Sequence, residues 1–163
     1  MGTGNLTDEK IAALIAMPKR VTNPGARRKV IGKHEQLTYN VLGNDNETSF
    51  QIFIRQSIKI VESFSCGLLW ISPICETVTL IRYNGANHPH DNPLERNHFE
   101  FNCHIHKATE RYIAANKKPE TFAEMTDRYR TLDGALNCLL NDCRVTGVVV
   151  EPENRTGDLF DGD

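Results

Sequence analysis

Long apolar runs are missing from the sequence, and their absence excludes a membrane-spanning protein. No stretch approaches the ~18 apolar residues of a transmembrane helix. Residues 1–20, MGTGNLTDEKIAALIAMPKR, carry charged side chains where a signal peptide has its apolar core. We therefore expect a cytoplasmic protein that has no membrane partner.

Paired cysteine motifs are also missing, which excludes zinc ribbons. The number of cysteines is odd, and none of them belongs to a CxxC pair. This usage is typical of reduced thiols in a reducing compartment rather than of a disulfide framework. The five are Cys66, Cys75, Cys103, Cys138 and Cys143.

What is present is typical of one globular domain. The chain has 163 residues, of which 39% are hydrophobic and 25% charged, with a formal net charge of −2. We assign residues 1–150 to a single α+β domain. Residues 151–163, EPENRTGDLFDGD, have five acids against Arg155 and little apolar content, so we expect an acidic, disordered tail.

Segment patterns along the chain predict the fold. Thr7 is a suitable N-cap for a helix with an apolar stripe at Ile11, Leu14 and Ile15. Strand-like segments follow from residue 28 to residue 83, and residues 119–130 and 131–143 have helical spacing of apolar side chains. This order predicts an α+β fold: a mainly antiparallel sheet of about five strands, with an N-terminal helix and C-terminal helices packed on it.

Histidines are concentrated in NHPHDNPLERNHFEFNCHIH, residues 87–106, which holds five of the six in the chain. Within it, HFEFNCHIH alternates apolar and polar residues, which predicts a half-buried strand. We expect Phe99, Phe101, Cys103 and Ile105 to face the core. His98, His104 and His106 are expected to share the exposed face.

The pair His104 and His106 suits two chemistries if both side chains lie on one strand face. The two imidazoles can bind one zinc-like ion together with a further ligand. Alternatively, one can accept a proton while the other donates one to a phosphate ester. A solvated polar strand face is the structural alternative. We expect the loop pair, His88 and His90, to meet the strand pair in one cleft.

Cationic and aromatic side chains near these histidines suit phosphate binding. Arg82 precedes the histidine loop and offers a planar, permanently charged donor to phosphate. Tyr83 beside it, and Arg111 after the second pair, are candidate RNA contacts. A basic segment without acids, residues 17–34, is a further candidate for holding an RNA backbone, through Lys19, Arg20, Arg27, Arg28, Lys29 and Lys33.

The segments RYNGANHPHDN and HFEFNCHIHKA, followed by a leucine-rich helix, resemble the TumE-type toxins of bacterial toxin–antitoxin pairs. The resemblance covers roughly residues 70–143. The chain departs from the family pattern at Gly85 and Ala86 and in a longer gap before the second histidine pair. The resemblance implies a ribonuclease that arrests growth until a partner antitoxin neutralises it. The matching residues are Arg82, Tyr83, Asn84, His88, His90, His104 and His106.

Three hypotheses follow. The first is a small endoribonuclease that needs no cofactor, with His104 and His106 as general base and general acid, Arg82 stabilising the transition state, and His88 and His90 in the same site. The second is a non-catalytic binding or inhibitor protein related to phages or defence. The third is a metal-dependent hydrolase with zinc at the histidine cluster. A homo-oligomer is compatible with each.

Overall fold

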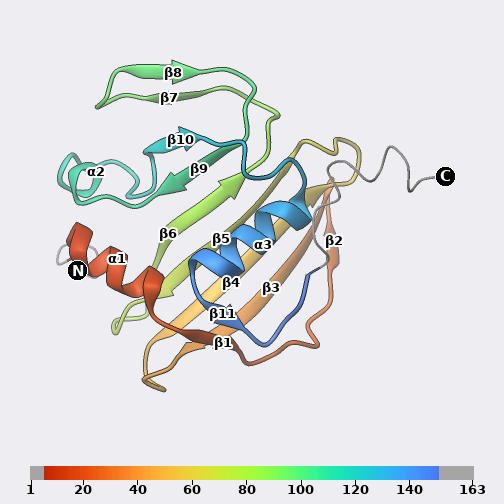
Figure 1. Ribbon diagram of the computed structural model, residues 1–163, viewed down its shortest axis with the longest axis vertical. Coiled ribbons are helices and arrows are strands. Elements are labelled where there is room, and N and C mark those ends of the chain that lie inside the picture. The colour runs from red at the N-terminus through yellow and green to blue at the C-terminus, as the bar shows by residue number, and fades with distance from the viewer. Residues whose placement is uncertain (1–5, 151–163) are drawn as a thin grey trace.

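The computed structural model describes residues 6–150, which contain three helices and eleven strands (Figure 1). The predicted acidic tail lies outside the described residues. The elements, in chain order, are α1 (Asp8–Ala16), β1 (Lys19–Val21), β2 (Lys29–Ile31), β3 (His34–Gly43), β4 (Ser49–Ser57), β5 (Phe64–Ile71), β6 (Thr77–Asn84), β7 (His90–Asn92), β8 (Asn97–Phe99), β9 (His104–Lys107), α2 (Glu110–Ala114), β10 (Ala123–Met125), α3 (Leu132–Asp142) and β11 (Val145–Thr146).

The main sheet has nine strands in the order β10-β9-β6-β5-β4-β3-β1-β11, with β2 also pairing with β3. All pairs are antiparallel except β1 with β11, so the sheet is mixed. β7 and β8 form a separate two-stranded sheet. The prediction of about five strands is therefore wrong. The sequence pattern does not reveal the short strands at the sheet edges, and residues 28–43 form two strands, β2 and β3, instead of one.

The prediction of several C-terminal helices is also wrong. Between residue 115 and residue 150, where the described part of the chain ends, α3 is the only helix, and residues 123–125 form β10 on the edge of β9. Within this segment, Tyr129 is buried and Met125 is 58% exposed, so their helix-like spacing marks no common face. Pairing with β9 satisfies the backbone groups at the sheet edge, which overrides the local helical pattern.

The two longer helices begin where the sequence predicts. Thr7 accepts a hydrogen bond from the Lys10 amide at the start of α1, and the stripe Ile11, Leu14 and Ile15 is buried. Thr131 caps α3 in the same way, and the leucines of α3 contribute to the core. The predicted cap and stripe of α1 and the predicted helix within residues 131–143 are confirmed.

The two faces of the central strands differ in composition. Ile52, Ile54, Cys66, Leu68 and Tyr83 are buried on the face where α1 and α3 lie (Figure 1). On the opposite face, alternate residues are exposed or half-buried, among them Thr38, Asn40, Gln51, Phe53, Arg55 and Ser65. We call this second face the open sheet face.

Two further sequence expectations concern absences. No disulfide joins the five cysteines, all of which lie in the described part of the chain. Among residues 6–150, no helix is both long and apolar enough to span a membrane.

Candidate functional site

The segment HFEFNCHIH does not form the continuous strand that its alternation predicts. β8 ends at Phe99 and β9 begins at His104, with a bend between them. Phe101 is 61% exposed, whereas His104 and His106 are 2% and 4% exposed. The prediction of an exposed histidine face is therefore wrong, because His104 and His106 turn inward on β9.

His98 lies apart from these two histidines. It belongs to β8 and is exposed, and its ring contacts the carboxylates of Asp91 and Glu100. Hydrogen bonds to these carboxylates raise its pKa above the ordinary value for histidine.

Strand pairing brings four polar side chains together. In the antiparallel pair of β6 and β9, Arg82 is opposite His106 and Asn84 is opposite His104. Directly opposed residues project on the same face of a sheet. All four side chains therefore lie on one face, where the β6 and β9 backbones are about 4.8 Å apart.

The β7–β8 sheet adds a third histidine, because His90 begins β7 and does not lie in a loop as predicted. The ring centroid of His90 lies 5.6 Å from that of His104 and 4.8 Å from that of His106, and the latter two are 5.0 Å apart. The predicted convergence of the two histidine pairs is thus confirmed. The rings and Arg82 line a cavity of about 240 Å³, which we call the histidine pocket. Its lining is Arg82, Asn84, His88, Pro89, His90, His104, His106, Lys118, Glu120 and Thr121.

Backbone carbonyls determine the tautomers of the two buried histidines. The Nδ1–H of His104 donates to the Asn102 carbonyl, and the Nδ1–H of His106 donates to the Glu120 carbonyl, both at 2.8 Å. Each neutral ring therefore has an unprotonated Nε2, which can accept a proton or bind a metal.

Burial keeps both rings neutral. Loss of hydration lowers the pKa of His106 to about 3, with the Arg82 charge as a further cause. The pKa of His104 is also lowered, again chiefly by burial. Both rings are thus neutral at physiological pH in the free protein.

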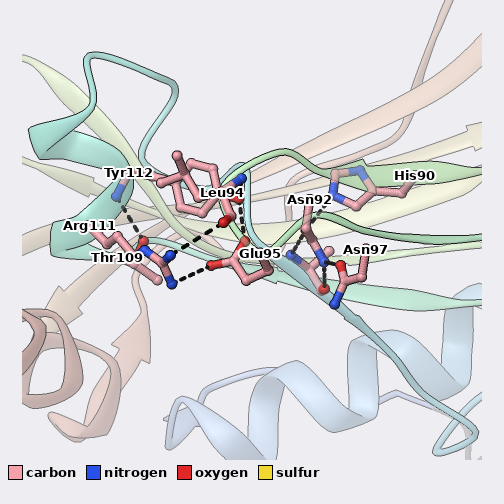
Figure 2. A network of polar contacts seen from close by, with 9 residues as sticks. His90, Asn92, Leu94, Glu95, Asn97, Thr109, Arg111 and Tyr112 are labelled. Carbon is pink, nitrogen blue, oxygen red and sulfur yellow. Dashed lines mark hydrogen bonds and ion pairs between the residues drawn. The ribbon is translucent and has the colours of Figure 1, made fainter.

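Asn92 holds His90 in place, and sequence reasoning missed it. Its side-chain oxygen accepts a hydrogen bond from the Ala123 amide, and its nitrogen donates to the Ala123 carbonyl. Figure 2 shows Asn92 beside His90. This pairing fixes the amide orientation, so the same oxygen accepts the Nε2–H of His90 at 2.8 Å. No sequence motif contains both Asn92 and Ala123. The two residues meet because β10 lies beside Asn92 in the fold.

Two buried polar atoms of the pocket have no hydrogen-bond partner among the described residues: the Nε of Arg82 and the Oδ1 of Asn84. The Nδ2 of Asn84 lies 3.5 Å from the Nε2 of His104. Burial lowers the pKa of Arg82, although Glu120 opposes this effect. The guanidinium nevertheless remains charged, because arginine does not lose its proton in proteins.

Two predicted RNA contacts are buried and point elsewhere. Lys19 is 3% exposed, and its ammonium donates to the carbonyls of Ile15, Met17 and Cys143 at 2.7–2.9 Å. Tyr83 is fully buried, and its hydroxyl donates to Asp142. Assigning these two residues to RNA binding is therefore wrong, since both stabilise the interior.

The other predicted RNA contacts are exposed. Arg28 pairs with Glu35, and Arg111 pairs with Glu95, which also accepts a hydrogen bond from Tyr112 (Figure 2). The rest are Arg20, Arg27, Lys29 and Lys33. Their role in RNA binding stays a prediction.

Zinc at the histidine cluster is the alternative that the third hypothesis keeps open. Within the described residues 6–150, no group of three or more His, Cys, Asp or Glu side chains has an arrangement that could hold a metal ion.

Comparison with known proteins adds no assignment: no family model, curated protein or solved structure matches the chain. The resemblance to TumE-type toxins thus stays a prediction.

Proposed function

We propose that this protein is a small, toxin-like endoribonuclease that cleaves RNA without a metal ion at the histidine pocket. The observation that carries the proposal is the half-buried Arg82, whose buried Nε has no protein partner among the described residues, beside three converging histidine rings. A permanent cation in such a pocket favours an anionic ligand. Phosphate matches the planar donor array of a guanidinium.

The unpartnered atoms favour RNA over other phosphates. The Nε–H of Arg82 requires an acceptor, and a phosphate oxygen supplies it. The Oδ1 of Asn84 requires a donor, and the ribose 2′-hydroxyl supplies it. RNA carries both groups on adjacent ribose carbons, the 2′-hydroxyl on C2′ and the phosphate on the oxygen of C3′.

The reaction that fits these groups is transesterification. The 2′-oxygen attacks the adjacent phosphorus as the phosphorus–O5′ bond breaks, leaving a 2′,3′-cyclic phosphate and a 5′-hydroxyl. One imidazole of the pair His104 and His106 takes the 2′-hydroxyl proton, and the other, protonated, gives its proton to the O5′. Arg82 stabilises the charge that accumulates on the phosphate oxygens.

The neutral state of both buried rings modifies this scheme. One ring must be protonated before it can act as the acid. An anionic phosphate bound beside Arg82 offsets its positive charge, which is one cause of the lowered pKa of His104 and His106. Substrate binding therefore raises the pKa of the pair and favours the protonated ring that the reaction needs.

The test is cleavage of end-labelled RNA by purified protein in EDTA. We expect products with 2′,3′-cyclic phosphate and 5′-hydroxyl ends. His106→Asn retains an amide donor for the Glu120 carbonyl but should lower the rate by about 10²–10⁴-fold. Arg82→Gln should lower it by about 10²–10³-fold. The control Lys10→Gln, an exposed charge on α1, should leave it unchanged.

One observation favours metal-dependent hydrolysis as the second candidate. Histidine ligands to metals commonly donate Nδ1–H to a carbonyl and bind through Nε2, as the hydrogen bonds of His104 and His106 allow. Activity that EDTA abolishes and Zn²⁺ restores would replace the first proposal by this one. RNA left intact under both conditions contradicts both proposals and leaves the non-catalytic binding protein.

The proposed cellular role includes a neutralising partner. A toxin-like ribonuclease slows growth when expressed alone, and a cognate antitoxin restores it. Growth of bacteria expressing the wild type, Arg82→Gln or Lys10→Gln tests this role. Arg82→Gln should relieve the arrest at equal protein level, whereas equal arrest by all three would show that toxicity does not depend on the pocket.

A further inference from the structure

A continuous row of side chains crosses the open sheet face and ends at the histidine pocket. Successive pairings place Lys29 opposite Gln36, Gln36 opposite Arg55, and Arg55 opposite Ser65. Ser65 is then opposite Asn84, and Asn84 is opposite His104. Opposed residues share one face, so this row spans six neighbouring strands at about 4.8 Å per step.

A second cavity lies along this row. It has a volume of about 180 Å³ and shares Asn84 and His88 with the histidine pocket. Arg55 and His34 line its far side. Arg55 is exposed and belongs to no ion pair within residues 6–150. The two cavities thus form one polar path between two arginines.

An aromatic ring lies beside this path. Phe53 is opposite Gly67, and Gly67 is opposite Arg82. A Cβ added at Gly67 would lie 2.5 Å from the Phe53 ring, so the ring covers this glycine and extends toward Arg82. Phe53 is only half-buried although it lies in the middle of the sheet. A half-exposed ring between two arginines is the arrangement on which a nucleic-acid base stacks.

We propose that single-stranded RNA binds across the open sheet face, with one base on Phe53, a phosphate at Arg55 and His34, and the strand continuing toward Lys29. This inference rests on the proposed function and specifies its substrate as an unpaired strand. Duplex RNA does not fit, because a base can stack on Phe53 only after it leaves its own helix. Positive charge at Lys29, Arg55 and Arg82 complements the phosphates of one strand.

Binding of fluorescein-labelled 2′-O-methyl RNA, followed by anisotropy over a range of salt concentrations, tests the inference. The blocked 2′-oxygen prevents cleavage, so binding is measured apart from catalysis. Phe53→Leu keeps an apolar group over Gly67 but removes the stacking face. We expect it to weaken binding by about fivefold or more, as for loss of about 1 kcal/mol or more of stacking, with an unchanged salt dependence.

Arg55→Gln and Lys29→Gln should act differently. Each removes one phosphate contact, which should reduce the slope of log affinity against log salt by about 0.7. Lys10→Gln on α1 removes the same charge away from the open sheet face and should leave both affinity and slope unchanged.

The outcomes separate the two proposals. If the wild type cleaves RNA but Phe53→Leu and Arg55→Gln bind like the wild type, the path across the sheet is wrong and the ribonuclease stands. Tighter binding of a duplex than of the single strand also overturns the inference. If the wild type neither cleaves RNA nor binds the 2′-O-methyl strand, both proposals fail.

Discussion

Acid should destabilise this protein through His106, and the size of the effect follows from its burial. The ring is 4% exposed, and its pKa is lowered chiefly by this burial and further by the Arg82 charge beside it. The hydrogen bond to the Glu120 carbonyl favours the charged ring and opposes these effects. The folded-state pKa is therefore about 3, against 6.5 for an ordinary histidine.

The sign and magnitude follow from proton linkage. Between these two pKa values, the unfolded chain binds a proton that the folded chain does not bind, so the free energy of unfolding falls as the pH falls. From about pH 7 to about pH 5, His106 alone should lower it by about 2 kcal/mol. The lowered pKa of His104 adds an effect of the same sign.

Urea unfolding of the wild type and of His106→Asn at the two pH values measures the effect. Asparagine retains a donor for the Glu120 carbonyl but does not titrate. The variant should lose about 2 kcal/mol less stability on acidification than the wild type does. The control Lys10→Gln changes an exposed side chain on α1 and should lose as much as the wild type. An equal loss of stability in His106→Asn and in the wild type would refute the reasoning. Such a result would mean that the pKa of His106 is the same in the folded and the unfolded state.

Three further predictions concern the supports of the pocket and its chemistry. Asn92→Ala should lower the free energy of unfolding by about 2–4 kcal/mol, because it leaves the buried amide and carbonyl of Ala123 without partners, and urea unfolding measures this. Gly67→Ala should cost about 1–3 kcal/mol in the same assay, since its Cβ would meet both the Phe53 ring and the Ile81 carbonyl, at 2.5 and 2.8 Å. The pH profile of kcat/KM for RNA cleavage should have its optimum on the acid side of neutral, because the pKa values of His104 and His106 are both lowered in the free protein. An optimum above neutral would contradict the assignment of these two histidines as the acid and the base.

Local signals in the sequence predicted part of this protein correctly. The cap at Thr7 and the apolar stripe of α1 predicted where the first helix begins, and the leucine spacing in residues 131–143 predicted α3. Chain order also predicted that His90 would meet His104 and His106, since a strand, a loop and a returning strand stay close in space. These signals are local in the chain.

Only the tertiary structure decided which side chains face the pocket. The alternation in HFEFNCHIH predicted exposed histidines, but the chain bends after Phe99, and β9 turns His104 and His106 inward against Arg82 and Asn84. Alternation identifies two faces of a strand without stating which one is covered. The covering comes from pairings between residues far apart in the chain.

The same limit explains Lys19 and Asn92. Lys19 belongs to a basic segment that resembles a phosphate-binding loop, yet the carbonyls of Ile15, Met17 and Cys143 surround its ammonium. Asn92 stands in a segment whose composition is typical of a loop. Its side chain nevertheless binds the Ala123 backbone, which orients its oxygen to accept the hydrogen bond from His90. The sequence by itself determined the residue types that carry the chemistry. The fold decided which of them meet, because burial and hydrogen bonding depend on partners that are distant along the chain.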